Sequence, residues 1–582
     1  MMISAPITLG LDLGQINTRA SLFNVIDGKY CLVGSEIAPT SHGINLGSGA
    51  GSAIRKLQQL TGHTLLKSGT GLMMPPEESD QGLDQLILVT SAGDRIRTAL
   101  FGLSEKGSLS AGQALTDSFP IDLIIRMGLS DLNRPSQVID ALVSERPEIV
   151  IITGGAEAGA EEPVRQWIEI TRLGIKLIPK SVRPVVVYAG LSSLQPYASR
   201  RLEPLTKLYM LPNLMPGVDQ WDLIPSQILL DHLIIQNWEQ KLTGLSELSQ
   251  LAQGVISTTS LALNRMVRFL GSSDCLIPVQ ADNPNTLAID LGGGQTIVSA
   301  LIEEQSGTIV QAAQPSNNEI FDEAMVSFLY QWTTAEVSLE EIRQYLCNLV
   351  VNPATIPETT VELAIQQALG RYRLRQSFIK LAQNYPWWLF DPQEGLKNRL
   401  GSIIISGAVL TQVPFPGQMA LMLLDSLRLR GITSLFVDRH QLLPLLGVMA
   451  ELDPRLPVHV LKSQVLTNVG TVISPFSYAP QGKTILSIQV TPDSGKTYLV
   501  DVNQGEFKRL VIPAGQTAVL DLVPEKTTDV GFGGNGLGGQ IEVKSGILDV
   551  VIDARGRPLP VPANNQERVP MLQDWLGTLG GR

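Results

Sequence analysis

The feature that most constrains this chain is a short motif that occurs twice. The segment Leu9-Gly10-Leu11-Asp12-Leu13-Gly14 returns 278 residues later as Leu287-Ala288-Ile289-Asp290-Leu291-Gly292. In both copies a threonine and then a serine follow at the same distances from the aspartate, and an alternating apolar pattern continues after them. Such alternation predicts a β-strand. Because self-similarity of this kind indicates duplicated units, the sequence predicts two related lobes that each open with a strand, a tight turn and a second strand.

Each copy is also predicted to continue through a hairpin turn. Asp27-Gly28 precedes an apolar segment at 30–34, and Gln305-Ser306-Gly307 precedes one at 308–311. Glycine-containing turns between apolar segments are typical of β-hairpins. A small antiparallel meander is therefore expected at the start of each lobe.

The remainder of the chain predicts an α/β layer structure with a β-rich end. Strand-like and helical segments alternate between the two motifs, as in layered α/β proteins. Short β-type segments separated by glycine and proline follow residue 465 and end in a helix at 571–576. The predicted strands include 86–89, 149–153, 185–189, 403–405 and 435–437. The predicted helices include 135–143, 161–170, 225–238, 246–269 and 442–451, and a helical region at 339–382 is predicted to interrupt the second lobe. We predict domains at 1–285, 286–465 and 466–582.

Composition excludes several classes of protein. The 582 residues carry a net charge of −11, and no cluster of lysine and arginine lies beside aromatic residues, so no nucleic-acid partner is expected. Apolar runs are shorter than the roughly 18 residues that a membrane span needs, and the N-terminus lacks a signal-peptide pattern. The three cysteines are widely separated, and the five histidines never have metal-ligand spacing. The sequence therefore predicts a cytoplasmic protein with no membrane partner.

The repeated motif suits the binding of a nucleoside triphosphate. Each copy places an aspartate at the end of a buried strand and follows it with a turn of small residues. Glycine lets backbone N–H groups approach phosphate oxygens, and an aspartate can orient Mg²⁺ through water. We predict Asp12 and Asp290 as catalytic and Mg²⁺-positioning residues; for each copy taken alone, a plain tight turn is the alternative. The residues predicted to hold ATP are Gly14, Asn17, Thr18, Gly292, Gly293, Gly294 and Thr296.

A third glycine element follows the apolar strand at 403–405. Ser406-Gly407 places a turn of small residues where a nucleoside could lie against exposed backbone, so both residues are predicted near the adenosine. Farther on, Gly447 lies within a helical pattern, where it would permit close packing of two helices across a hinge or serve simply as a packing site.

The order of these three elements resembles the actin, Hsp70 and sugar-kinase superfamily. Finer details resemble the MutL/GlmL family that is associated with glutamate mutase, and the resemblance runs from about residue 8 to 460. The motifs that carry it include Val89-Thr90-Ser91-Ala92-Gly93, Ile151-Ile152-Thr153-Gly154-Gly155-Ala156-Glu157-Ala158-Gly159 and Asn213-Leu214-Met215-Pro216, and a segment near the end, 551–558, extends it. This family is unrelated in role to the mismatch-repair protein of the same name.

The resemblance implies a two-lobed actin-like ATPase fold, which is a duplicated ribonuclease H-like fold with a C-terminal β-rich domain. It also implies a chaperone-like ATPase that reactivates an adenosylcobalamin-dependent mutase of the glutamate mutase type, with ATP and Mg²⁺ as cofactors. The sequence contains no cobalamin-binding Asp-x-His-x-x-Gly motif, so the cobalamin would belong to the client enzyme.

The chain departs from the family pattern at several positions. The first motif has Gln15 and Ile16 where the family usually carries serine and threonine, and Arg19 where it has lysine or valine. The second motif has Ile297 where the family has an aspartate, and the loss of an acid that could order Mg²⁺ or water indicates slow hydrolysis.

Another carboxylate could orient the water in place of the missing acid. We predict Glu157, with Glu161 and Glu162 beside it, for this catalytic role. Acids that stabilise a helix N-terminus are the equally weighted alternative.

Two further functions stay open. One is a small-molecule kinase or an ATP-dependent amidohydrolase of the hydantoinase A type, whose ATP turnover would rise with a metabolite instead of with a protein. The other is a non-hydrolysing nucleotide-binding scaffold, which the missing acid and the extra β-rich domain favour.

Overall fold

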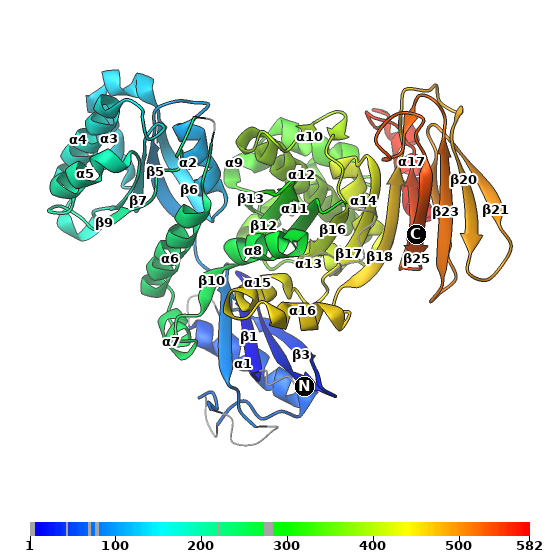
Figure 1. Ribbon diagram of the computed structural model, residues 1–582, viewed down its shortest axis with the longest axis horizontal. Helices are drawn as coiled ribbons and strands as arrows, with labels where there is room; N and C mark the ends of the chain where they lie inside the picture. The colour runs from blue at the N-terminus through cyan, green and yellow to red at the C-terminus, as the bar shows by residue number, and fades with distance from the viewer. Residues whose placement is uncertain are drawn as a thin grey trace. The chain divides into compact units, whose positions relative to one another are not determined.

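The computed structural model describes residues 6–41, 45–67, 71–75, 81–218, 220–272 and 283–581. These fall into two compact units, one formed by Met1–His42, Ser48–Val89 and Ala262–Arg582 and the other by Gly43–Gly47 and Thr90–Leu261 (Figure 1). No helix within the described ranges is long and apolar enough to cross a membrane. The first five residues, which entered the prediction of localisation, lie outside these ranges. The predicted domain boundaries stay predictions.

The first unit begins with the predicted antiparallel meander. Strands β1 (Thr8–Leu13), β2 (Asn17–Ile26) and β3 (Lys29–Pro39) pair in sequence order, and β4 (Gln85–Thr90) lies on the other side of β1. The turn between β2 and β3 is at Asp27 and Gly28, as predicted, and both residues have positive φ angles (50° and 74°).

The same unit contains a second sheet that repeats this topology. Strands β11 (Thr286–Leu291), β12 (Gln295–Ile302) and β13 (Gln305–Ala312) form the meander, and β16 (Ser402–Ser406) and β17 (Gly431–Val437) add to β11 as parallel strands. The sheet order is β13-β12-β11-β16-β17. Two meanders of this kind, the second extended by parallel strands, make this an α/β protein with a two-lobed actin-like ATPase fold.

In the sequence, helices lie between the meander β11–β13 and the parallel strand β16 of this sheet. The long helix α12 (Thr360–Asn384) packs against β12, β13 and α14. The other helices of the lobe are α9 (Asn317–Ile320), α10 (Glu323–Trp332), α11 (Leu339–Val351), α13 (Ala408–Thr411), α14 (Pro416–Leu427), α15 (Leu443–Leu452) and α16 (Arg455–Lys462), and a small hairpin consists of β14 (Phe390–Asp391) and β15 (Gly395–Leu396).

The hairpin turn predicted at Gln305-Ser306-Gly307 is wrong by two residues. The turn lies at Glu303 and Glu304, whose φ angles are 48° and 69°, because a two-residue turn with both φ values positive matches the twist of the flanking strands. Gly307 lies inside β13 instead. An added Cβ there would come within 2.7 Å of the Tyr385 ring, so close packing accounts for this glycine.

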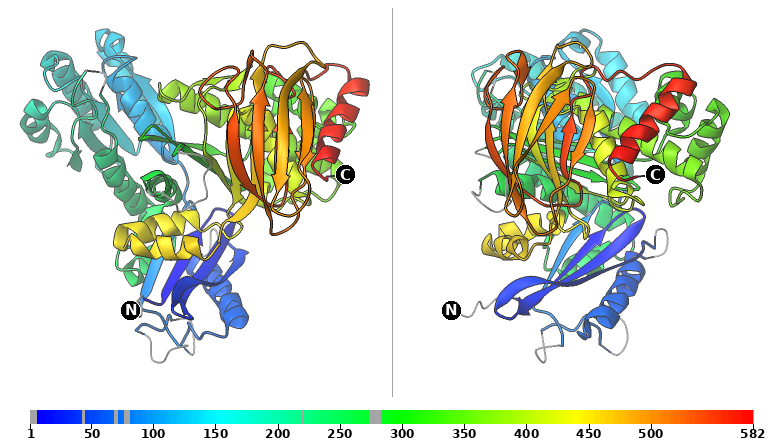
Figure 2. Two further views of the ribbon diagram at one scale, coloured as in Figure 1. Left: turned by 45° about the vertical axis from the view of Figure 1, so that its right-hand side comes forward. Right: turned by 90° about the vertical axis from the view of Figure 1, so that its right-hand side faces the viewer.

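The strands that follow the second lobe continue its sheet. Strands β18 (Thr467–Ser474), β26 (Asp549–Asp553) and β22 (Phe507–Leu510) extend the order beyond β17. A second, antiparallel sheet packs over them, with apolar side chains of both sheets in one core (Figure 2). Its strands are β20 (Thr484–Pro492), β21 (Tyr498–Asn503), β23 (Thr517–Pro524) and β25 (Gly539–Lys544), and the helix α17 (Asn565–Thr578) packs against β22 and α14. The region is strand-rich as predicted.

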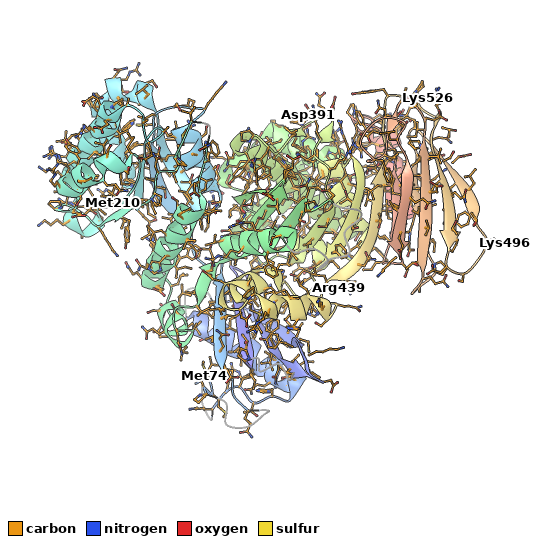
Figure 3. The ribbon with its side chains drawn as sticks, viewed as in Figure 1. Met74, Met210, Asp391, Arg439, Lys496 and Lys526 are labelled. Atoms are coloured by element: carbon orange, nitrogen blue, oxygen red, sulfur yellow. The ribbon has the colours of Figure 1, made fainter. Side chains whose placement is uncertain are left out.

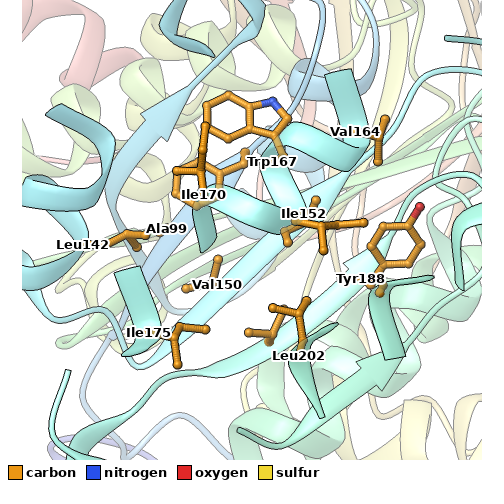
Figure 4. Close-up of a cluster of buried hydrophobic side chains, with 14 of the residues drawn as sticks. Ala99, Leu142, Val150, Ile152, Val164, Trp167, Ile170, Ile175, Tyr188 and Leu202 are labelled. Carbon is orange, nitrogen blue, oxygen red and sulfur yellow. The ribbon is translucent and has the colours of Figure 1, made fainter. Parts of the chain in front are cut away.

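The second unit is built on a parallel sheet. Its strands β5 (Ile96–Phe101), β6 (Ile121–Met127), β7 (Ile149–Thr153), β8 (Val185–Ala189) and β9 (Leu208–Met210) pair in the order β6-β5-β7-β8-β9. This 2-1-3-4-5 order is that of a doubly wound fold. Helices α3 (Pro135–Glu145), α4 (Glu161–Leu177) and α5 (Gln195–Leu202) pack on one face, and Trp167 is one of the buried side chains labelled in Figure 4. The Trp167 ring stacks on that of Phe101 with centroids 4.7 Å apart.

The single helix predicted at 246–269 is also wrong. The segment forms α7 (Leu245–Leu251), the short strand β10 (Ile256–Thr258) and α8 (Thr259–Ser272). The chain leaves the first helix through Gln253 and Gly254, which have φ angles of 54° and 79°. Positive φ at two successive residues ends a helix although the apolar pattern continues.

Candidate functional site

The first phosphate-loop motif forms a tight connection between β1 and β2. The Gly14 N–H donates to the Asn17 carbonyl at 3.0 Å, and a Cβ on Gly14 would lie 2.7 Å from that oxygen. Glycine is therefore required by the turn itself. The strand register pairs Asp12 with Arg19, so both side chains arise at the same level of the sheet.

The second motif repeats this geometry at the equivalent positions. The Gly292 N–H donates to the Gln295 carbonyl at 3.0 Å, and Asp290 pairs with Ile297 in the strand register. The sequence repeat therefore corresponds to a repeat of backbone hydrogen bonds and strand register.

The two loops approach each other within the same compact unit. An added Cβ on Gly293 would lie 2.5 Å from Ile16 Cδ1, and one on Gly294 would collide with the side chain of Gln15. The fold thus brings Gln15 and Ile16 into contact with Gly293 and Gly294, which lie far away in the sequence.

The third element lies beside the second loop. Ser406 is the parallel-strand partner of Asp290, and a Cβ on Gly407, whose φ is 86°, would lie 2.5 Å from Asp290 Oδ1. The Ser406 hydroxyl is buried and has no hydrogen-bond partner in the described structure. These two residues therefore join the same site.

Asp438 is a site residue that the sequence analysis missed. It follows β17 directly and is fully buried. Its Oδ2 accepts a hydrogen bond from the Leu443 N–H at 2.8 Å, whereas its Oδ1 has no partner in the described structure. The signal was present, because Val437-Asp438 repeats the pattern of an apolar strand that ends in an aspartate. The next residue, Arg439, is exposed and is labelled in Figure 3.

These carboxylates repel one another in a buried setting. Burial raises the pKa of Asp12 to about 7, with Arg19 opposing the shift and Asp438 adding to it. Burial together with the charges of Asp12 and Asp438 raises the pKa of Asp290 to about 7. Burial also raises the pKa of Asp438, although the backbone amides of Leu442 and Leu443 stabilise its ionised form. A bound cation would relieve this repulsion.

The threonines of the two motifs differ in their surroundings. The Thr18 hydroxyl lies 2.9 Å from that of Thr40, which donates to the Gly14 carbonyl at 2.8 Å, so Thr18 supports the first loop from inside. The Thr296 hydroxyl is buried without a partner in the described structure. Asn17 is exposed.

Glu157 belongs to the second compact unit, whereas the other predicted site residues belong to the first. Its Oε2 accepts hydrogen bonds from the Ser192 hydroxyl (2.6 Å) and N–H (3.1 Å). Glu161 and Glu162 form the first turn of α4, as expected of acids at a helix N-terminus. The catalytic role of Glu157 stays a prediction.

Gly447 lies where α15 meets α8. An added Cβ would collide with the Ala262 carbonyl, so the two helices pack closely at this point. The helices pack closely here as predicted, and the hinge stays a prediction. Strand β1 also packs against α15, since a Cβ on Gly10 would lie 2.8 Å from Leu445 Cδ1.

The donor set suits Mg²⁺ that is held through water and phosphate. In the described part of the chain no group of three or more His, Cys, Asp or Glu residues is arranged to ligate a metal directly. Mg²⁺ usually keeps several waters and takes only one or two carboxylates together with substrate phosphates. Asp12 and Asp290 meet that requirement, and the buried hydroxyl oxygens of Thr296 and Ser406 and Oδ1 of Asp438 have no hydrogen-bond partner in the described structure.

Comparison with models of known protein families shows to which family this chain belongs. A family model described as MutL protein matches residues 8–465, well over half of the chain. The chain belongs to the MutL protein family. Membership of the MutL family confirms the resemblance that the sequence motifs indicated. No curated protein sequence matches the chain.

Solved structures give only distant similarities to this MutL family member. A glycerol dehydratase reactivase matches with 9% identity over 72% of this chain and 95% of its own, with a TM-score of 0.26. A diol dehydratase-reactivating factor in nucleotide-free form matches with 11% identity over 77% of this chain and 100% of its own, with a TM-score of 0.28. A Ppx/GppA phosphatase from Aquifex aeolicus has 9% identity, 79% and 89% coverage and a TM-score of 0.21. All three TM-scores lie below 0.5, and the actin-like architecture therefore rests on the sheet topology.

Binding of Mg-nucleotide is expected to weaken as the pH falls from 8 to 6. Protons and Mg²⁺ compete for the Asp12 and Asp290 carboxylates, whose pKa values are both about 7, so at pH 6 most of these groups are protonated. We expect the Kd for Mg-ATP to rise about tenfold over this range. Calorimetric titration at constant free Mg²⁺ measures it. In the Asp12→Asn/Asp290→Asn variant, any residual binding should lose this pH dependence.

Proposed function

We propose that this chain is an ATP-binding, chaperone-like protein that reactivates an adenosylcobalamin-dependent mutase of the glutamate mutase type, with ATP and Mg²⁺ as cofactors and the mutase as its partner in the cytoplasm. One observation carries the nucleotide part of the proposal: two equivalent glycine turns and three carboxylates, Asp12, Asp290 and Asp438, converge in one place. Membership of the MutL family supports the proposal that the client is an adenosylcobalamin-dependent mutase.

The roles proposed for the individual residues agree with the geometry of the two loops. Asp12 and Asp290 would orient the waters of Mg²⁺, and bound Mg²⁺ neutralises phosphate charge. The backbone amides of Gly14, Gly292, Gly293 and Gly294, with Asn17 and the Thr296 hydroxyl, would hold the phosphates, while Ser406 and Gly407 would lie near the adenosine. Thr18 would support the first loop.

The two glycine turns come from different sheets. A ligand that touches both therefore favours one arrangement of the lobes over others, and its loss or hydrolysis shifts that balance. A surface that moves with the lobes could then bind one conformational state of the client enzyme more tightly than another.

The proposal is tested by titrating the purified chain with Mg-ATP and then measuring ATP turnover with and without an adenosylcobalamin-dependent glutamate mutase. We expect saturable binding and turnover that rises at least about fivefold with the mutase, a coupling of roughly 1 kcal/mol. An unrelated protein at the same concentration is the control. Turnover that responds to a metabolite and not to the mutase would favour the kinase or amidohydrolase alternative.

Asp438 is proposed as the carboxylate that replaces the acid missing at Ile297. Burial raises the pKa of Asp438, and the backbone amides of Leu442 and Leu443 oppose that shift by stabilising the ionised form. Its Oδ1 has no hydrogen-bond partner in the described structure, so the ionised carboxylate could accept a hydrogen bond from water. We expect Asp438→Asn to lower the turnover of ATP about 100-fold while the Kd for Mg-ATP changes less than about threefold. Asp27→Asn, in an exposed turn that already has positive φ, is the matched control and should leave both values unchanged.

The non-hydrolysing scaffold stays the second candidate, because Ile297 carries no carboxylate and the two phosphate loops are in contact through Gln15 and Ile16. A mutase complex whose affinity is the same with and without nucleotide would favour it.

A further inference from the structure

Gln15 and Ile16 lie directly against the second phosphate loop. The position that a Cβ of Gly293 would take is 2.5 Å from Ile16 Cδ1, and the corresponding position at Gly294 is filled by the Gln15 side chain. Carbon atoms in contact are normally about 3.5–4.0 Å apart. The two side chains therefore occupy the space over the backbone of Gly293-Gly294 that only glycine leaves open.

This contact bears on phosphate binding because glycine loops act through their backbone. Their N–H groups reach phosphate oxygens when no side chain lies between them. Here two side chains of the first loop lie against the second loop at the Cα atoms of Gly293 and Gly294. The positions concerned are the two at which the first motif departs from the usual serine and threonine, both of which are shorter side chains with a hydroxyl group.

The contact also explains why residues 293 and 294 are glycines even when no ligand is bound. Gly14 is required by its own turn, since an added Cβ would lie 2.7 Å from the Asn17 carbonyl oxygen, and Gly292 is tightly placed in its turn, with an added Cβ 3.2 Å from the Gln295 carbonyl oxygen. The turn that contains Gly293 and Gly294 does not itself require glycine at these two positions, because the nearest atoms that an added Cβ would meet belong to Ile16 and Gln15 of the first loop.

We propose that Gln15 and Ile16 set the nucleotide affinity of this site by occupying the second phosphate loop until a nucleotide displaces them. The inference rests on the proposed nucleotide site and adds to it. A ligand that binds only the fraction of molecules in which the two side chains have moved has an apparent affinity reduced by that fraction. Shortening both side chains removes the competition and leaves the backbone of both loops intact.

The test is calorimetric titration of the full-length chain and of the Gln15→Ser/Ile16→Thr variant with Mg-ATP. We expect the variant to bind at least about tenfold more tightly, with the gain in the association rate as measured by stopped flow. The matched control is Ile26→Thr/Gln489→Ser, which makes the same two exchanges at exposed positions and should bind as the unmodified chain does. Gln15→Asn/Ile16→Val provides a milder variant if the first one unfolds at a lower temperature.

The possible outcomes separate the inference from the proposed function. Equal affinity of the unmodified chain and the variant overturns the inference and leaves the proposed function standing. Binding by the variant alone supports the inference and removes nucleotide dependence from the proposed function of the native chain. If neither protein binds Mg-ATP at millimolar concentration, both are wrong.

Discussion

Replacing both Asp12 and Asp290 with asparagine is expected to weaken Mg-ATP binding at least about 100-fold while making the nucleotide-free protein more stable at pH 8. Asparagine has the size of aspartate and no charge, so it cannot orient the waters of Mg²⁺. A hundredfold loss of affinity corresponds to about 2.7 kcal/mol. Calorimetric titration with Mg-ATP measures the first effect and urea unfolding the second.

The gain in stability follows from the sign of the pKa shifts. Both pKa values are raised in the folded protein, from 3.8 to about 7, so the folded state holds protons more tightly than the unfolded state. The free energy of unfolding therefore falls as the pH rises from about 4 to about 7, and the full penalty is present at pH 8. We expect a gain of about 2 kcal/mol at pH 8 and a smaller gain at pH 5.

The same experiments include a control and a result that would contradict the site. Asp27→Asn removes one exposed carboxylate and should change neither affinity nor stability. An affinity for Mg-ATP that stays within about threefold of the unmodified chain in the double variant would show that these aspartates do not form the Mg²⁺ site.

Replacing Arg555 with methionine is expected to destabilise the first unit by about 3–5 kcal/mol. Arg555 Nη1 lies 2.8 Å from Asp425 Oδ1 and Arg555 Nε lies 2.8 Å from Asp553 Oδ1, and all three side chains have 0% exposure. The guanidinium also stacks near the rings of Phe507 and Trp575, 4.6 Å and 4.4 Å from their centroids. The substitution leaves two buried carboxylates without this cation.

The network joins distant parts of the chain. Arg371 of α12 pairs with Asp425 of α14 at 2.8 Å, and Arg557 pairs with Asp553 at 3.0 Å. Burial opposes ionisation of Asp553, but Arg555 and Arg557 hold its pKa well below the ordinary value. The end of β26 is therefore fastened to the helices of the second lobe, which gives the family-like segment at 551–558 a structural role.

The measurement for Arg555→Met is the free energy of unfolding in urea at pH 7. Arg455→Met is the matched control, because Arg455 pairs with Asp453 on the surface and its loss should change stability little. A decrease below about 1 kcal/mol for Arg555→Met would mean that the buried network does not fasten the C-terminal segment.

Parts of the site were predictable because they lie within short stretches of sequence. Asp12 and Gly14 belong to one turn, and Asp290 and Gly292 to another, so the repeat itself identified them. Asp438 shares the same local pattern but has no glycine turn after it and no equivalent in the repeat. The parallel pairing of β17 with β16, and of β16 with β11, is what carries it to the site.

Other features could not be predicted, because they depend on which loops and helices meet. The contact of Gln15 with Gly294 joins positions in different lobes, and the pairing of Arg555 with Asp425 joins positions 130 residues apart. The turn at Glu303-Glu304 was missed because neither residue is typical of positive φ.

The sequence by itself determined the duplicated α/β architecture, the family and the two aspartate turns, because strand alternation and turn formation are set by residues a few positions apart. Only the tertiary structure decided that Asp438 shares the site with Asp12 and Asp290, that Gln15 and Ile16 contact the second loop, and that the C-terminal strands continue the second lobe's sheet. These properties come from burial and electrostatic interaction between segments that are far apart in the chain, and a linear pattern carries no record of which segments come into contact.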